Sequence, residues 1–359
     1  MEKKALIAMS GGVDSSVAAL LCQQAGFDCM GVTLKLYDNE DAGLPREKTC
    51  CSVDDVADAR SVAFRLGMPF YVFNFKEAFR REVMDRFVQA YERGETPNPC
   101  VDCNRYIKFE KLMHRGEEIG FPYVATGHYA RVEFDGAAGR WLLKKGLDEN
   151  KDQSYMLWSL TQWELSRLLL PLGGLTKERV RQLAEEHGFL NARKRDSQDI
   201  CFVPDGDYAA FIRRYAGKEF PPGAFVGTQG QVYGQHKGII HYTVGQRKGL
   251  GLSFPQPMFV KELDVEKNRV VLAKAEELFS QEVIARDINL ISVESIPAPL
   301  RAKARVRYRQ KEQPATVLQT GPDELRVVFD QPQRAVTPGQ SLVLYDGDTV
   351  VGGGKIARK

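Results

Sequence analysis

The stretch Ala-Met-Ser-Gly-Gly-Val-Asp-Ser-Ser at residues 8–16 decides the fold of this chain. The apolar run at residues 5–9 enters it, as is typical of a strand buried on both faces of a parallel sheet. Apolar residues then recur at helical spacing until Gly26 ends the pattern. The sequence therefore predicts a strand, a glycine turn and a helix.

The glycine turn has the composition of a phosphate-binding loop. Gly11 and Gly12 allow successive backbone N–H groups to point into one concavity at the positive end of the helix. No lysine follows these glycines, so the turn is not a Walker loop. Asp14 would repel phosphate unless a divalent cation such as Mg²⁺ lay between them. The turn resembles the signature loop of the ATP pyrophosphatases, which implies that Ala8, Met9, Ser10, Gly11, Gly12, Val13, Asp14 and Ser15 bind ATP.

The bulk composition is that of a soluble protein with several domains. The chain has 359 residues, of which 43% are hydrophobic and 27% charged. Its formal net charge is only +3, so any nucleic-acid surface must be a local concentration of basic residues. The sequence shows no signal peptide and no apolar run long enough for a bilayer, so we expect a cytoplasmic protein without membrane contact.

Strand-like and helix-like runs alternate through the first 130 residues and predict an α/β fold with a doubly wound parallel sheet. ATP should lie above the carboxyl edge of that sheet. Leu34, at the end of the second strand, could meet the adenine edge or simply belong to the core. Gly127 is a second place where backbone could approach the nucleotide. We expect strands at 31–36, 70–75 and 124–131, and helices at 53–66, 156–170, 177–187 and 207–215.

The second half of the chain changes character, because Gly, Pro and β-branched runs dominate it. We therefore predict three domains: an ATP-binding catalytic domain at 1–205, a small β-rich domain at 206–278, and a C-terminal β-barrel at 279–359.

The seven cysteines, at 22, 29, 50, 51, 100, 103 and 201, all precede the last 158 residues. In a reducing compartment this distribution indicates chemistry or a metal rather than structural disulfides. Cys100 and Cys103 have the spacing of a zinc knuckle, but no second pair follows. They also precede a helix expected to open at 107–109, where the positive dipole end favours a thiolate. We expect Cys22, Cys29, Cys50 and Cys51 to pack as small buried residues. An iron–sulfur cluster held by Cys50, Cys51 and Cys100 stays open.

Two basic stretches stand out. The residues at 301, 303, 305, 307, 309 and 311 are all Arg or Lys, which at period two predicts six cations on one face of one strand. Such a face protects an edge strand or binds a polyanion, and the mutual repulsion of six charges favours the polyanion. Arg193, Lys194 and Arg195 precede Cys201 and could form a solvated turn, lower the pKa of the Cys201 thiol or hold phosphate.

Seven ordered motifs carry a specific resemblance. They are Ser-Gly-Gly-Val-Asp-Ser (10–15), Asn-Pro-x-x-x-Cys-Asn (98–104), Thr-Gly-His-Tyr-Ala-Arg (126–131), Lys-Asp-Gln-Ser-Tyr (151–155), Ser-Gln-Asp-Ile-Cys-Phe (197–202), Tyr-Thr-Val-Gly-Gln-Arg-Lys-Gly-Leu-Gly (242–251) and Val-Thr-Pro-Gly-Gln (336–340). The first resembles the signature of the ATP pyrophosphatases, and the set resembles the tRNA-specific 2-thiouridylases.

The resemblance implies an adenine nucleotide α-hydrolase-like catalytic domain that adenylates the 2-carbonyl oxygen of the wobble uridine of tRNA and replaces it with sulfur. It implies Cys103 as nucleophile and Cys201 as persulfide carrier, with formation of a disulfide bond between them. Asn98, Pro99 and Cys100 would meet the target base. The tRNA would contact His128, Lys151, Asp152, Gln153 and Gln340. The alternating cations at 301–311 separately predict a contact with tRNA phosphates in which Arg307 and Tyr308 are central. Many relatives carry Asp where this chain has Cys100, so a general-base role at that position is in doubt.

The implied partners are tRNA and a persulfide sulfur donor such as a cysteine desulfurase or a relay protein. The sequence leaves the donor, the tRNA set and the oligomeric state open, with a monomer among the alternatives. Two other functions remain in view: an amide-forming ATP pyrophosphatase, and a non-catalytic tRNA-binding protein whose cysteines hold zinc or an iron–sulfur cluster.

Overall fold

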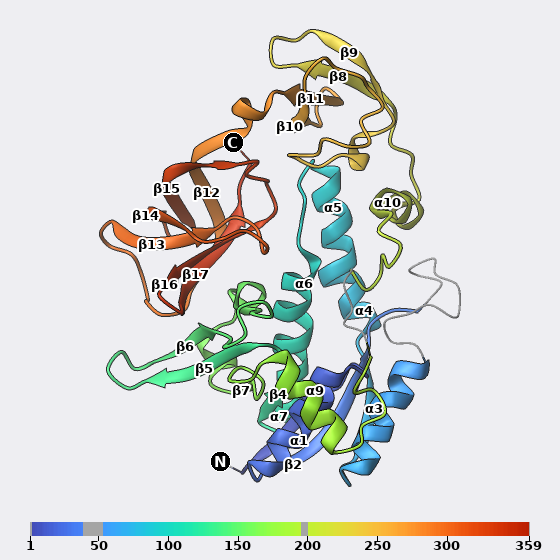
Figure 1. The fold of residues 1–359 in the computed structure, drawn as a ribbon, viewed down its shortest axis with the longest axis vertical. Helices are drawn as coiled ribbons and strands as arrows, with labels where there is room; N and C mark the ends of the chain where they lie inside the picture. Colours follow the sequence, from blue (N-terminus) through green and yellow to red (C-terminus); the bar gives the residue numbers. More distant parts are fainter. Residues whose placement is uncertain (1, 39–52, 195–199, 359) are drawn as a thin grey trace. The chain divides into compact units, whose positions relative to one another are not determined.

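The computed structural model describes residues 2–38, 53–194 and 200–358, which divide into two compact units (Figure 1). The first unit comprises Met1–Val83, Cys100–Gly206 and Gly347–Val350. The second comprises Met84–Pro99, Asp207–Asp346 and Val351–Lys359. The predicted three-domain division remains a prediction, and Cys50 and Cys51 lie outside the described residues.

A parallel sheet forms the centre of the first unit, as the sequence predicts. Among the described residues its strand order is β3-β2-β1-β4-β7. Ala5, Leu6 and Ile7 of β1 are fully buried, because helices cover both faces of a doubly wound sheet. The strands are β1 Lys4–Ala8, β2 Asp28–Lys35, β3 Phe70–Asn74, β4 Tyr123–Ala125 and β7 Leu168–Leu169.

Several helices accompany this sheet (Figure 1). They are α1 Val13–Gln24, α3 Val53–Arg65, α4 Lys76–Phe79 and α9 Lys177–Glu186. A further helix runs without a break through α6 Pro99–Asp102, the π-helical stretch η2 Cys103–Lys111 and α7 Leu112–Glu118. It begins at Pro99 rather than near residue 107, because a proline is well tolerated in a first helical turn. Cys100 and Cys103 therefore lie inside the helix and not before it.

Two segments of the first unit differ from the prediction. The expected helix at 156–170 is instead a 3₁₀ turn, η3 Ser154–Leu157, then a short helix, α8 Gln162–Leu165, and then β7. Residues 157–160 are all buried, so this part of the segment has no exposed face to present as an amphipathic helix. The expected strand at 124–131 is divided between β4 and β5 Ala130–Asp135, and β5 pairs with β6 Arg140–Lys145.

The second unit contains a small sheet and a closed barrel, which confirms the predicted β-rich second half (Figure 1). In the described chain the small sheet has the order β10-β11-β8-β9, and the barrel closes where β12 pairs with β17. The strands of the small sheet are β8 Gly223–Gly227, β9 Val232–His236, β10 Phe259–Asp264 and β11 Arg269–Ala273. Those of the barrel are β12 Phe279–Leu290, β13 Leu300–Arg305, β14 Gln313–Gly321, β15 Glu324–Arg334, β16 Ser341–Asp346 and β17 Thr349–Ile356. The helices of the second unit include η1 Arg80–Asp85 at the unit boundary, α5 Arg86–Glu92, α10 Tyr208–Ala216, η4 Ile239–His241 and η5 Ala275–Leu278.

The predicted strand of six cations is wrong. Strand β13 ends at Arg305, and the chain then turns back into β14, which pairs antiparallel with β13. An alternating pattern cannot distinguish a long strand from a strand followed by a turn. Three of the six cations are also engaged within the second unit: Arg301 with Asp330, Arg305 with Glu312, and Arg307 with backbone carbonyls.

None of the helices in the described ranges combines the length and the apolar character that crossing a bilayer requires.

Candidate functional site

The loop between β1 and α1 has the shape that phosphate binding requires. Gly11 has φ +75°, and a Cβ there would lie 2.8 Å from the Cα of Asp55, so the position needs glycine. A Cβ on Gly12 would meet only the Ser10 Oγ, at 3.5 Å, so this side of the loop offers space. The Ser15 hydroxyl donates to the Gly12 carbonyl at 2.9 Å and accepts from the Ser10 N–H at 3.2 Å. The first N–H groups of α1 have no acceptor within the helix and suit an anion in that space.

The carboxylate of Asp14, in the first turn of α1, is held by two residues from far along the chain. The Lys177 Nζ donates to Asp14 Oδ1 at 2.7 Å and to Oδ2 at 2.8 Å. The Tyr129 hydroxyl donates to Asp14 Oδ1 at 2.8 Å. Tyr129 belongs to a motif that the sequence singled out, whereas Lys177 appears there only as the start of an amphipathic helix. Sequence reasoning therefore missed it.

We expect the pair of Asp14 and Lys177 to contribute a measurable coupling to stability. The side chains of Lys177 and Asp14 are 11% and 29% exposed, so removing the ammonium leaves a partly buried carboxylate without this partner. A double-mutant cycle with Asp14→Asn and Lys177→Met, followed by urea denaturation, should give a coupling of about 1–2 kcal/mol.

An exposed ion pair provides the control for this cycle. Arg193 and Glu185 pair at 3.0 Å, but the Arg193 side chain is 89% exposed. Arg193→Met should therefore change the free energy of unfolding by less than about 0.5 kcal/mol. Additive effects of Asp14→Asn and Lys177→Met would mean that the pair contributes nothing.

A segment following α9 also contacts the loop. The Asn191 Nδ2 donates to the Gly11 carbonyl and to the Ser16 Oγ, both at 2.9 Å. The Lys194 Nζ pairs with Asp58 at 2.6 Å and with Asp55. Burial opposes the charge of Lys194, but the hydrogen bonds to the two carboxylates outweigh burial and raise its pKa. This lysine thus stays charged and ties the loop to α3.

These contacts bear on the predicted effect of cations on Cys201. Lys194 and Arg193 each pair with a carboxylate in the structure, and Arg195 lies outside the described residues. A lowered pKa of the Cys201 thiol therefore stays a prediction.

The motif at 126–131 lies against the loop. A Cβ on Gly127 would lie 2.7 Å from the carbonyl carbon of Asp14, so the two backbones touch. The His128 Nδ1 lies 2.8 Å from the Thr126 Oγ1. Burial, with a smaller contribution from the charge of Lys108, lowers the pKa of His128 to about 3. His128 is therefore neutral near pH 7, and any contact it makes with tRNA is a hydrogen bond or a stacking contact.

The neutral state of His128 predicts a pH dependence of stability. Its pKa is about 3 when folded and near the ordinary 6.5 when unfolded, so between these values the unfolded chain binds more protons. The free energy of unfolding should fall as the pH drops below 6.5, by up to about 1.4 kcal/mol per pH unit. Urea titrations at pH 7 and pH 5 should show a smaller loss for His128→Gln than for the unmodified chain. Equal losses would contradict the assignment.

The stretch Lys151–Gln153 holds the turn that carries this motif. Asp152 is buried, and its carboxylate accepts hydrogen bonds from the N–H groups of Gly146 and Ser154, both at 3.1 Å. The Gln153 Oε1 accepts from the Tyr129 N–H at 3.0 Å, and the Gln153 N–H donates to the Tyr129 carbonyl at 2.9 Å. The predicted contact of this stretch with tRNA is untested.

The five described cysteines lie in different settings. Cys103 is buried where the π-helical stretch begins, Cys100 is exposed, and Cys201 is half-buried. Stretches of π-helix are frequent at functional sites. The predicted core position of Cys22 and Cys29 is confirmed, and burial raises the pKa of Cys22 to about 12 and that of Cys29 to about 11.

Aromatic residues connect the segment of Cys201 to α4. The Tyr37 hydroxyl donates to the Cys201 carbonyl at 2.6 Å. The ring of Phe79 lies 5.9 Å from that of Tyr37 and 5.8 Å from that of Phe202. Helix α4 also contacts η2, the stretch that begins at Cys103. One short helix therefore packs against the segments that carry both cysteines.

The remaining predicted residues are placed as follows. Leu34 is buried at the end of β2, and Pro99 is buried while Asn98 is half-buried. Arg307 Nη2 donates to the carbonyls of Val244 and Ala335, and Gln340 Nε2 donates to the Thr96 carbonyl. Tyr308 is half-buried. Within the described ranges, no three His, Cys, Asp or Glu side chains gather as metal ligands, and the suggested cluster involves cysteines outside them.

Comparison with known proteins gives matches over nearly the whole chain. Family models described as tRNA methyl transferase HUP domain, tRNA methyl transferase PRC-barrel domain and aminomethyltransferase β-barrel domain match residues 3–205, 209–274 and 280–356. The tRNA-specific 2-thiouridylase MnmA of Clostridioides difficile is 50% identical over 358 residues, which are 100% of this chain and 99% of the relative. The proteins of the same name from Acetivibrio thermocellus and Carboxydothermus hydrogenoformans are 49% and 50% identical, over 99% of this chain and 99% and 98% of the relatives.

Proposed function

The chain belongs to the family of tRNA-specific 2-thiouridylases, and we propose that it uses ATP to replace the C2 oxygen of the wobble uridine of tRNA with sulfur. The observation that carries the proposal is the presence, in one folded unit, of the loop at 10–16 together with Cys103 and Cys201. The proposed reaction adenylates the C2 carbonyl oxygen, accepts sulfur from a cysteine persulfide, and releases AMP and pyrophosphate.

The geometry of the loop suits the binding of ATP. The concavity beside Gly12 and the N–H groups that open α1 suit the phosphates. In this proposal Leu34 and Gly127 approach the nucleotide with their backbone. Mg²⁺ would supply charge neutralisation between the phosphates and Asp14, whose carboxylate oxygens are the ligand type that this ion prefers. Lys177 and Tyr129 then act by orienting that carboxylate.

The sulfur relay uses two cysteines in succession. The persulfide of Cys201 attacks the adenylated C2 atom, and AMP leaves with the former carbonyl oxygen. The thiolate of Cys103 then attacks the Cys201 sulfur, which breaks the sulfur–sulfur bond and leaves the new sulfur on the uridine. The products are a Cys103–Cys201 disulfide and the 2-thiouridine, and a thiol reductant reopens the disulfide. A cysteine desulfurase or a relay protein would reload Cys201.

The descriptions of the family models name methyl transfer, whereas the names of the full-length relatives name thiolation. A methyltransferase does not need a loop for the phosphates of ATP in the same unit as Cys103 and Cys201. The loop together with these two cysteines therefore favours sulfur transfer.

The remaining assignments of the sequence analysis complete the proposal. Asn98, Pro99 and Cys100 meet the target base, and tRNA also contacts His128, the stretch 151–153 and Tyr308. Arg307 and Gln340, which the sequence analysis also expects at the tRNA, instead donate hydrogen bonds to carbonyls of the chain itself. The catalytic domain is proposed at 1–205, the β-rich domain at 206–278 and the barrel at 279–359.

Mass spectrometry of wobble nucleosides tests the function directly. Cells lacking the protein should lose 2-thiouridine derivatives, and purified protein with ATP, a persulfide donor and unmodified tRNA should restore them. Normal 2-thiouridine levels in the deletion strain, with no thiolation in vitro, would overturn the proposal. Anaerobic purification with metal and sulfide assays separates the relay from a cluster mechanism.

A further inference from the structure

A loop of the C-terminal barrel, residues 337–340, makes hydrogen bonds to the segment that leads to Asn98 and Pro99. The Thr96 N–H donates to the Pro338 carbonyl at 2.9 Å, and the Gln340 Nε2 donates to the Thr96 carbonyl at 2.6 Å. Both backbone polar groups of Thr96 are thus used by the loop 337–340, although Thr96 belongs to no helix or strand.

Glycine allows the loop to approach this closely. Gly339 has φ +87°, and a Cβ there would lie 3.0 Å from the Glu95 Cβ and 3.1 Å from the Thr96 nitrogen. The loop itself is anchored to the end of β17, because the Gly339 N–H donates to the Ile356 carbonyl and the Ile356 N–H donates to the Gln340 carbonyl. The hydrogen bonds to Thr96 therefore come from a loop that is anchored to the barrel and not from the preceding helix α5.

Arg307 fixes the other end of the loop. Its Nη2 donates to the Ala335 carbonyl at 2.8 Å, the Thr337 Oγ1 at 2.6 Å and the Val244 carbonyl at 3.1 Å. Thr337 is 1% exposed and also donates to the Ala335 carbonyl. A guanidinium that satisfies several acceptors at once holds this part of the loop in one conformation.

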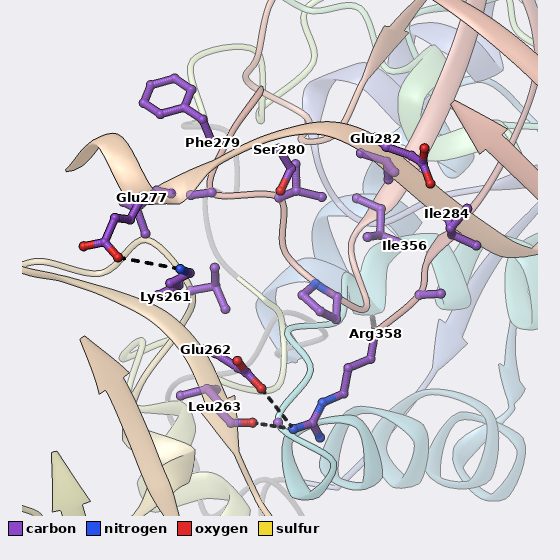
Figure 2. A pocket seen from close by; sticks show the side chains of 18 residues that line it. Lys261, Glu262, Leu263, Glu277, Phe279, Ser280, Glu282, Ile284, Ile356 and Arg358 are labelled. Carbon is purple, nitrogen blue, oxygen red and sulfur yellow. Dashed lines mark hydrogen bonds and ion pairs between the residues drawn. The ribbon is translucent and has the colours of Figure 1, made fainter. Parts of the chain in front are cut away.

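A cavity lies beside residues 94–96, so packed side chains do not hold this segment on the cavity side. The cavity measures about 400 Å³, and its wall includes Gly94, Val336 and Pro338. Figure 2 shows Arg358 among the lining residues, where Nη2 donates to the Leu263 carbonyl at 2.9 Å. The Gly94 and Glu95 N–H groups donate to the Tyr91 and Ala90 carbonyls of α5, at 3.0 Å and 2.9 Å, so it is the placement of Thr96 that depends on the contacts with the loop.

We infer that the loop 337–340 positions the segment that carries Asn98 and Pro99, and that Gln340 is a positioning residue acting through Thr96. The inference rests on the proposed function for the identity of the base, since Asn98 and Pro99 receive the target uridine only if the chain thiolates tRNA. The loop sets where the uridine is presented, and Arg307 holds the loop.

Amide hydrogen exchange of the full-length protein without tRNA or ATP tests the positioning. Gln340→Met removes the donor to Thr96 while keeping the length of the side chain. Losing a hydrogen bond should speed exchange at the amides of Thr96 and Asn98 by about fivefold to tenfold. Gly339→Ala should have the same effect at the same residues, because its Cβ displaces Glu95 and Thr96. Gln331→Met, at an exposed position on β15, is the matched control and should change nothing.

Thiolation kinetics separate positioning from direct RNA contact. For Gln340→Met we expect kcat at saturating tRNA to fall about tenfold, with an unchanged tRNA Kd and salt dependence, because a displaced base reacts slowly once bound. Unchanged exchange at Thr96 and Asn98 in both variants would overturn the inference. So would a weaker Kd with a flatter salt dependence and normal kcat, which is the signature of a lost phosphate contact. Because exchange is measured without tRNA, failure of the proposed function leaves this test intact.

Discussion

Cys201→Ser should abolish persulfide loading, and Cys103→Ser should accept a persulfide yet lose turnover by a factor of at least about 10³. Loading needs a nucleophilic thiol at the residue that receives sulfur, whereas release of the thiolated uridine needs a second thiolate to break the sulfur–sulfur bond. Mass spectrometry of the loaded protein and single-turnover thiolation of tRNA measure the two steps separately.

Cys100→Ser is the control for these variants and should do less harm than either. Cys100 is exposed and Cys103 is buried, so alkylating agents should modify Cys100 first in the tRNA-free protein. Inactivation by alkylation therefore cannot identify the nucleophile, and substitution is required. Full activity of Cys103→Ser together with an inactive Cys100→Ser would move the nucleophile to the first cysteine of the pair.

Gly12→Val should reduce release of AMP and pyrophosphate by about 100-fold while leaving the protein folded. Gly12 has φ −88° and ψ 158°, which a β-branched residue adopts readily, and a Cβ there meets only the Ser10 Oγ. The new side chain therefore occupies the space proposed for the phosphates and does not strain the loop. Measurement of tRNA-dependent pyrophosphate release, with thermal unfolding in parallel, gives both quantities.

Substitutions at two other glycines serve as comparisons for Gly12→Val. Gly11→Ala should destabilise the fold itself, because its Cβ would overlap the backbone of Asp55 at a positive φ. Gly136→Ala, in the turn between β5 and β6 with no atom within 4 Å of the added Cβ, should be neutral. Normal pyrophosphate release by Gly12→Val would show that the loop is misassigned.

The helices and strands whose apolar residues follow a single period could be predicted from the sequence. The apolar run at 5–9, the glycine pair and the helical spacing after it predict the β1–loop–α1 unit, and the parallel sheet is confirmed. The helix at 177–187 agrees with α9 because its apolar residues form a single stripe. The predicted helix at 156–170 is wrong because this stretch is buried from several sides and its apolar residues form no single stripe.

The sequence by itself determined the loop, the order of its motifs and the fold class, because backbone conformation and burial pattern depend on neighbours within a few residues. Only the tertiary structure showed that Lys177 reaches Asp14 across 163 positions, that Tyr37 reaches Cys201 across 164, and that Gln340 reaches Thr96 across 244. It also turned Arg307 from a presumed member of a charged strand into a residue that binds carbonyls of its own unit. The physical reason is that a charged or amide side chain takes whichever partner folding brings within about 3 Å, and separation along the chain carries no information about that partner.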